Sequence, residues 1–184
     1  MANVNKIEQY NKGTVFPDSY EETYLATKHI SDIKLAIPND IFKKLKQKIE
    51  EKGLYFGDDS VLRNIIAGII KGNIILQGPP GTGKTTLAKI ICDVFEVAYT
   101  EATANSDWTT YDSIGGLQPS ANDEGHEVIE GKNGYVVSSI LKCCDLIVKN
   151  ENDNGTLQGN WLILDELNRC EIDKVFGDLF TALG

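Results

Sequence analysis

The chain has 184 residues, a length that suits a single domain, and 41% of them are hydrophobic, which allows a sizeable core. Its formal net charge of −9 at pH 7 argues against a broad DNA-binding face, and the sequence carries no direct nucleic-acid signal. No apolar stretch approaches the about 20 residues of a membrane span, and the N-terminus has no signal-peptide core, so we expect a cytoplasmic protein without membrane contact.

Residues 1–36 are polar and weakly patterned, and we interpret them as an N-terminal leader or linker before one domain at residues 37–184. Apolar residues then recur at helical spacing from Ile41 to Ile49, and Gly53 follows them. The same spacing recurs over residues 58–71, with Gly72 at the natural end. Two amphipathic helices are therefore predicted.

Residues 73–77 form a short apolar run before a glycine-rich turn, which predicts a buried strand. A helix is predicted over residues 84–95, and a second strand over residues 97–101. Residues 103–134 are rich in small polar residues and turn formers, which indicates loops and a possible hairpin.

Ser138 is the predicted cap of a helix that reaches about Lys149, and residues 150–159 read as a polar loop. A third buried strand is predicted over residues 161–164, followed by a helix whose apolar face starts at Ile172. Alternating strands and helices are typical of an α/β fold with a parallel sheet.

The four cysteines lack the C-x-x-C spacing of zinc sites, and only His29 and His126 could complete such a site. We interpret them as reduced, mostly buried thiols. They are Cys92, Cys143, Cys144 and Cys170.

The turn before the third predicted helix matches G-x-x-x-x-G-K-[ST], the pattern of a phosphate-binding loop. Its glycines let the backbone N–H groups surround a phosphate, and the following helix adds its positive N-terminal end. Lys84 would reach the β- and γ-phosphates, and the Thr85 hydroxyl would bind Mg²⁺. The predicted binding residues are Gly78, Pro79, Pro80, Gly81, Thr82, Gly83, Lys84, Thr85 and Thr86. An ordinary glycine turn is the alternative, which the flanking strand and helix disfavour.

The last predicted strand ends in two carboxylates, Asp165 and Glu166. Asp165 is placed to hold Mg²⁺ together with Thr85, and Glu166 to act as the general base that polarises the attacking water. Glu166 and Lys84 are thus the predicted catalytic residues. The alternative is a buried strand that happens to leave the core through acidic residues.

The stretches GPPGTGKTTLAK and WLILDELNR resemble those of AAA+ ATPases. GLYF at residues 53–56, DWTTYDSIGGLQP at 107–119 and DELNRCEIDKVFGDLFTAL at 165–183 resemble the MoxR/McrB-like, dynein-related branch of that superfamily. The resemblance implies a three-layer α/β/α P-loop NTPase with a parallel sheet. It also implies ATP, or GTP, with Mg²⁺ as cofactors, a homo-oligomeric ring, and a protein substrate or a nuclease partner.

Three further residues match or lie beside these stretches. Arg169 fits the D-E-[IL]-N-R pattern and either acts near a subunit boundary or is an ordinary exposed arginine at a helix start. Trp108 and Tyr111 could face a neighbour or a substrate, but ordinary packing is favoured for them.

The resemblance also implies parts that this chain lacks: a fourth strand between the phosphate-loop strand and the acidic strand, a fifth strand, an arginine finger and a helical lid. We therefore expect an incomplete AAA+ core from a longer motor, with little hydrolysis by the chain alone. Three functions stay open at this point: an ATP-driven remodelling motor, a GTP-dependent McrB-like restriction subunit, and a non-catalytic nucleotide-binding fragment.

Overall fold

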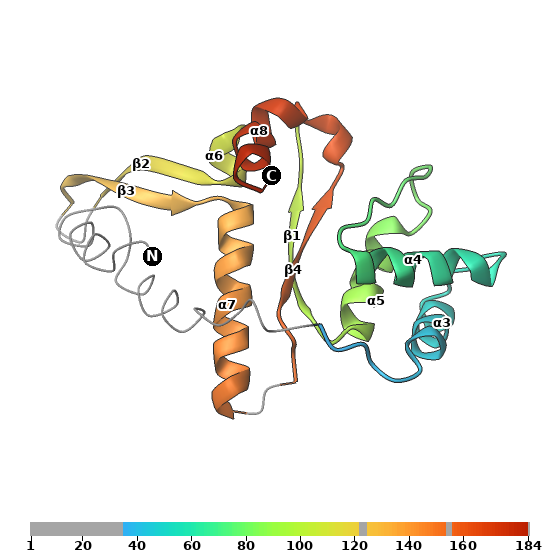
Figure 1. The fold of residues 1–184 in the computed structure, drawn as a ribbon. Coiled ribbons are helices and arrows are strands. Elements are labelled where there is room, and N and C mark those ends of the chain that lie inside the picture. Colours follow the sequence, from blue (N-terminus) through green and yellow to red (C-terminus); the bar gives the residue numbers. More distant parts are fainter. Residues whose placement is uncertain (1–34, 122–124, 154–155, 184) are drawn as a thin grey trace.

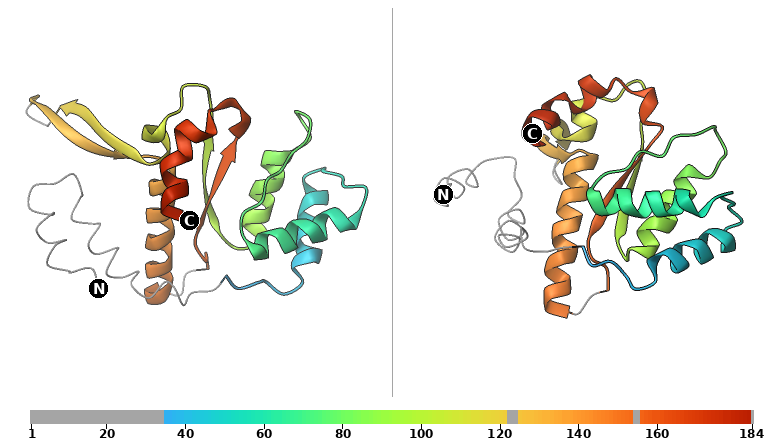
Figure 2. Two further views of the ribbon diagram at one scale, coloured as in Figure 1. Left: turned by 45° about the horizontal axis from the view of Figure 1, so that its top comes forward. Right: turned by 45° about the vertical axis from the view of Figure 1, so that its right-hand side comes forward.

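The computed structural model describes residues 35–121, 125–153 and 156–183 (Figure 1). Two strands, β1 (Ala98–Thr103) and β4 (Asn160–Asp165), form a parallel pair. Helix α7 (Tyr135–Asp153) covers one face of this pair, and α5 (Lys84–Val94), α3 (Ile41–Glu51) and α4 (Asp59–Lys71) lie on the other side (Figures 1 and 2). This layering of helix, parallel sheet and helix confirms the predicted α/β/α class.

A second sheet extends away from the layers as a hairpin, visible in Figure 2. It pairs β2 (Gly115–Ala121) with β3 (Glu127–Asn133) in antiparallel register. The short helix α6 (Thr110–Ser113) precedes the hairpin. After β4 come a 3₁₀ turn, η2 (Leu167–Arg169), and the last helix, α8 (Ile172–Leu183).

The alternation of side chains along the parallel strands divides the core into two clusters. Tyr99, Trp161 and Ile163 point to one face and pack against the helices α3, α4 and α5. Ala102 and Leu164 point to the other face, where Trp108, Val175 and Phe176 are buried. Each strand therefore contributes to both layers, as expected for a sheet that is covered on both sides.

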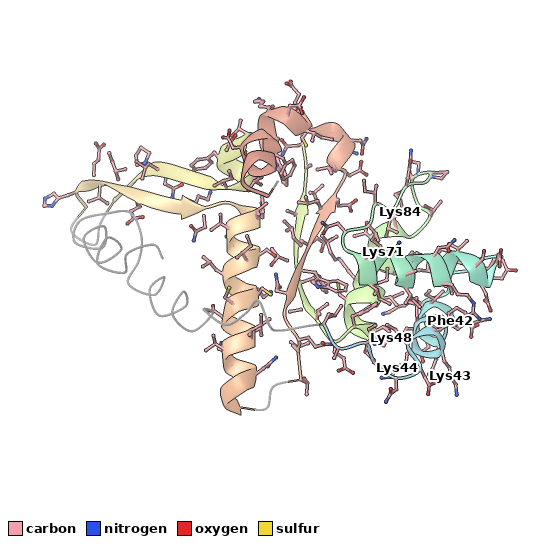
Figure 3. The ribbon with its side chains drawn as sticks, in the orientation of Figure 1. Phe42, Lys43, Lys44, Lys48, Lys71 and Lys84 are labelled. Atoms are coloured by element: carbon pink, nitrogen blue, oxygen red, sulfur yellow. The ribbon has the colours of Figure 1, made fainter. Side chains whose placement is uncertain are left out.

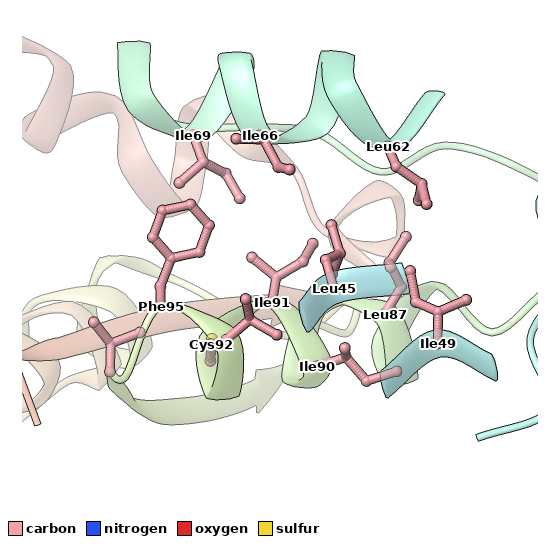
Figure 4. Packing of buried hydrophobic residues seen from close by; sticks show 12 residues of the cluster. Leu45, Ile49, Leu62, Ile66, Ile69, Leu87, Ile90, Ile91, Cys92 and Phe95 are labelled. Atoms are coloured by element: carbon pink, nitrogen blue, oxygen red, sulfur yellow. The ribbon is translucent and has the colours of Figure 1, made fainter. Parts of the chain in front are cut away.

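Three helices meet in the larger cluster, as Figure 4 shows, because each carries apolar residues at helical spacing. The buried residues are Leu45 and Ile49 of α3, Leu62, Ile66 and Ile69 of α4, and Leu87, Ile90, Ile91, Cys92 and Val94 of α5. The ring of Phe95 packs on that of Trp161 with centroids 5.4 Å apart, which joins this cluster to the sheet.

The helix ends follow from local chemistry. Asp58 begins α4 by accepting a 2.8 Å hydrogen bond from the backbone N–H of Ser60, and hydrogen bonds from Ser60 lower the pKa of this carboxyl group. Gly72 follows α4 with φ of 147°, and Gly53 follows α3 with φ of 69°, in a region that favours glycine. These two predicted helix ends are confirmed.

The strand predicted at residues 73–77 is wrong. These residues are not a strand, and the side chain of Ile75 is 90% exposed. The physical reason is the lack of a ladder partner: β1 and β4 pair directly with each other, and within the described part of the chain nothing pairs with residues 73–77. The parallel sheet of this structure therefore has two strands.

Smaller differences have local causes. Helix α7 begins at Tyr135, so Ser138 does not cap it; its N–H donates to the carbonyl of Gly134 at 2.9 Å within the first turn. The helix also continues through residues 150–153, which were predicted as loop. Residues 161–165 of β4 are half-buried rather than buried.

The four cysteines are free thiols. Cys92 and Cys170 are buried, whereas Cys143 and Cys144 are half-buried. Burial raises the pKa of the Cys92 thiol to about 11, with a smaller contribution from the neighbouring Asp93 carboxylate. Among the described residues, no helix is long and apolar enough to cross a membrane.

Candidate nucleotide-binding site

The predicted phosphate loop leads directly into α5, where its last glycine stands at the N-cap. Gly81 and Gly83 have φ of 76° and 80°, so the chain turns through left-handed conformations that other residues rarely adopt. The carbonyl of Gly83 accepts the first helical hydrogen bond, from the N–H of Leu87 at 2.8 Å. Residues 78–82 are exposed, so this turn is accessible to a ligand.

Lys84 closes the loop on itself. Its ammonium group donates to the carbonyl oxygens of Gly78 at 3.0 Å and Pro79 at 2.8 Å. The hydroxyl of Thr82 donates to the same Pro79 carbonyl at 2.9 Å. Figure 3 places Lys84 at this loop, away from the lysines Lys43, Lys44 and Lys48 of α3. The positive charge of Lys84 thus lies at the turn. A phosphate could replace the two carbonyl oxygens as its hydrogen-bond acceptors.

Thr85 meets Asp165 at the end of β4. The Thr85 hydroxyl donates to Oδ2 of Asp165 at 2.7 Å, and both side chains are half-buried. The two residues predicted to hold Mg²⁺ therefore lie side by side. A hydroxyl oxygen and a carboxylate are the hard oxygen donors that Mg²⁺ prefers, so this pair fits the ion that the loop implies.

Glu166 lies next to this pair in a constrained backbone conformation. Its φ is 54°, and its N–H donates to Oδ1 of Asp165 at 2.9 Å. Its carboxylate accepts a 3.0 Å hydrogen bond from Nε of Arg169, and the two side chains are 42% and 61% exposed. Asp165 thereby receives one donor on each oxygen, and Arg169 restrains the predicted general base.

Leu54 contacts the phosphate loop from the α3–α4 connection, a role that we did not predict. A Cβ atom added to Gly83 would lie 2.5 Å from Cδ2 of Leu54, so the two segments touch closely at this point. The neighbouring Tyr55 is 89% exposed. The stretch GLYF at residues 53–56 was the available signal, but its spacing alone did not reveal this contact.

Lys89 and Glu101 form a second contact between α5 and the sheet that sequence reasoning missed. Nζ of Lys89 lies 2.7 Å from Oε2 of Glu101, and the ammonium lies 5.8 Å from the centre of the Tyr99 ring. The hydrogen bond to Glu101 raises the pKa of Lys89. The available signal in the sequence was that Lys89 follows Thr85 by four residues, so that both lie on the same face of the helix.

Trp108 and Tyr111 are packed, as favoured from the sequence. Trp108 is 5% exposed and stacks on Tyr135 with ring centroids 5.3 Å apart. The hydroxyl of Tyr111 donates to Oε1 of Gln118 at 2.8 Å, at the base of the hairpin.

Comparison with known proteins agrees with this geometry. The family model described as the AAA domain (dynein-related subfamily) matches residues 73–184, from the phosphate loop through Asp165 to α8. The chain belongs to this AAA family. As a member, it is a P-loop protein of the nucleotide-binding AAA+ ATPases.

Relatives of this AAA chain occur in fungi and bacteria. The mitochondrial Lon protease homologs of Candida dubliniensis and Candida albicans are each 35% identical over 124 residues, which cover 65% of this chain and 10% of theirs. A staphylococcal protein, from Staphylococcus epidermidis, is 28% identical over 99 residues, which cover 54% of this chain and 32% of its own. The matches thus span about a third of the staphylococcal relative and about a tenth of the Lon homologs.

Proposed function

We propose that this AAA chain binds Mg²⁺·ATP at the loop from Gly78 to Thr85 and, as part of an oligomeric ring, hydrolyses ATP to drive a remodelling motor. The hydrogen bond between Thr85 and Asp165 carries this proposal most directly. It joins the phosphate loop to the acidic end of β4, the two halves that a metal–phosphate complex must contact together.

Phosphate binding would use the contacts that Lys84 makes within the loop. Its ammonium group would exchange the carbonyls of Gly78 and Pro79 for β- and γ-phosphate oxygens, and backbone N–H groups of the turn and of the α5 N-terminus would bind the same anion. Thr85 and Asp165 would hold Mg²⁺, which neutralises part of the phosphate charge.

Glu166 would supply the proton chemistry. Hydrolysis forms a bond between a water oxygen and the γ-phosphorus, breaks the bond from that phosphorus to the β–γ bridging oxygen, and passes a water proton to the Glu166 carboxylate. The ion pair with Arg169 keeps this carboxylate at the end of β4, close to Asp165. Arg169 is proposed as a restraint on the base, rather than as a residue at a subunit boundary.

The core is proposed to be incomplete as it stands. Residues 73–77 have no ladder partner among the described residues, and β4 pairs there with β1 alone. Ile75, inside the first of these segments, is exposed. A further strand fits there and would satisfy their N–H and C=O groups. An arginine contributed within a ring would then support hydrolysis, which is why we expect slow turnover by this chain alone.

The MoxR/McrB-like branch and a cytoplasmic location remain proposals that rest on the three sequence stretches and the composition. Membership of that branch would imply a protein substrate or a nuclease partner for the ring. The same stretches keep GTP as the alternative nucleotide.

Competition binding tests the proposal. The purified chain is mixed with a fluorescent ATP analogue and Mg²⁺, and unlabelled ATP or GTP is added as competitor. We expect ATP to displace the analogue more effectively than GTP. The opposite preference would replace ATP by GTP, and the absence of any analogue binding by the folded chain would refute a nucleotide-binding function.

A further inference from the structure

Helix α5 makes two polar contacts with the parallel strands, and they lie on one face of the helix. Thr85 donates to Asp165 on β4 at 2.7 Å, and Lys89 pairs with Glu101 on β1 at 2.7 Å. Residues four positions apart on a helix are neighbours on its surface. The two contacts therefore fix α5 at two successive turns, one on each strand.

The register of the strands places the two carboxylates on one face of the sheet. Glu101 is opposite Ile163, and Thr103 is opposite Asp165, so Glu101 and Asp165 are diagonal neighbours on the side that α5 covers. The side chains of Lys89 and Glu101 are 38% and 34% exposed, so about a third of each side chain is open to solvent. Glu101 and Asp165 both raise the pKa of Lys89, Glu101 the more strongly, which agrees with an ammonium group close to both carboxylates.

We propose that Lys89 is a positioning residue for the Mg²⁺ end of the nucleotide site. Its ion pair with Glu101 fixes the rotation of α5 at which the Thr85 hydroxyl reaches Asp165. The inference rests on the proposed function, since it concerns how the site holds Mg²⁺·ATP. Lys89 itself does not contact the nucleotide in this account.

The exposure of the pair argues against a purely stabilising role. Ion pairs exposed by a third or more contribute little to folding stability. The main effect of the Lys89–Glu101 ion pair should therefore be on the geometry of the site. We expect to see it in the affinity that Mg²⁺ adds to ATP binding.

The test uses variants that keep the local net charge, because a change in charge alone would alter the attraction of Mg²⁺. In the neutral double variant, Lys89→Met with Glu101→Gln, the ion pair is lost. The exchanged double variant, Lys89→Glu with Glu101→Lys, reverses the pair. A matched control is Lys46→Met with Asp59→Asn, which removes a 2.9 Å ion pair of similar exposure between α3 and α4.

ATP affinity is measured by calorimetry on the full chain, in Mg²⁺ and in EDTA. The ratio of the two dissociation constants gives the gain due to Mg²⁺. We expect this ratio to fall about fivefold in the neutral double variant, with the EDTA value unchanged, and to return to within about twofold of wild type in the exchanged variant. The α3–α4 control should keep the wild-type ratio.

Three results would overturn the inference: a wild-type ratio in the neutral double variant, an equal loss in the α3–α4 control, or no recovery in the exchanged variant. If the neutral double variant does not fold, Lys89→Gln with Glu101→Gln, which replaces both charged groups by neutral amides, is measured in its place, with the same expected fall. Failure of wild type to bind ATP would reject the proposed function as well, whereas normal wild-type binding with an unchanged ratio in the variant rejects this inference alone.

Discussion

Thr85 and Asp165 lie 80 positions apart in the sequence, and the hydroxyl of Thr85 donates a 2.7 Å hydrogen bond to Oδ2 of Asp165. The contact exists because the first turn of α5, directly after the phosphate loop, lies beside the carboxyl end of β4. Ligands of open α/β sheets bind at this end of the strands. Because one hydrogen bond makes this contact, single substitutions can test the part of the site proposed to hold Mg²⁺.

Thr85→Ala should remove most of the affinity that Mg²⁺ adds to ATP binding. The variant loses the hydroxyl that fits Mg²⁺ and leaves Oδ2 of Asp165 without this donor. Hydrogen bonds to charged groups contribute about 1.5–3 kcal/mol, so the loss should be about tenfold or more in Mg²⁺ and small in EDTA. Thr85→Ser keeps the hydroxyl and is the control. Equal affinities of the alanine and serine variants in Mg²⁺ would contradict the assignment.

Glu166→Gln should keep nucleotide affinity within about twofold while lowering turnover about a hundredfold or more, since general-base catalysis contributes about 10²–10⁴ in rate. The measurement is phosphate release under conditions in which the assembled protein hydrolyses ATP. Glu171→Gln, at an exposed position after the η2 turn, serves as the control. Glu166 is not the base if both variants hydrolyse ATP at the wild-type rate.

Gly83→Ala should destabilise the fold more than Gly81→Ala. Both glycines have positive φ, which costs an alanine about 1–2 kcal/mol. Only at Gly83 would the added Cβ also collide with a side chain, Cδ2 of Leu54 at 2.5 Å, whereas Gly81 has nothing within 4 Å. We expect a total of about 2–4 kcal/mol for Gly83→Ala in the free energy of urea unfolding. Equal costs at the two positions would show that Leu54 does not press on the loop.

The buried thiol of Cys92 should make stability depend on alkaline pH. Its pKa in the folded chain is about 11, above the ordinary value of 9.0, so the unfolded chain loses this proton first. The stabilisation is complete below about pH 9 and is lost as the pH rises toward about 11. Urea unfolding of wild type and Cys92→Ala should give a stability difference that shrinks over this window. A difference that stays constant with pH would contradict the shift.

Helices were the best predicted part of the fold because their signals are local. The spacing of Leu62, Ile66 and Ile69 and the glycine at position 72 together specify α4 without knowledge of the rest of the chain. The phosphate loop was equally clear as a pattern, since its glycines, Lys84 and Thr85 occur in one short stretch.

Strand pairing was less predictable because it depends on distant segments. An apolar run at residues 73–77 looks like a strand, but a strand also needs a partner, and the sequence does not show which segment provides one. The pairing of Lys89 with Glu101 was missed for a related reason. It depends on the crossing of α5 over β1, which neither segment encodes alone.

Calorimetric titration of Mg²⁺·ATP into the wild-type chain and into Lys84→Ala tests whether the loop from Gly78 to Thr85 binds nucleotide phosphates. We expect measurable heat of binding for wild type. For Lys84→Ala, which removes the ammonium group that donates to the Gly78 and Pro79 carbonyls, we expect a loss of affinity of at least about a hundredfold with unchanged circular dichroism. Equal binding by the two folded proteins, or no binding by either, would contradict the claim that this loop holds the phosphates of a nucleotide.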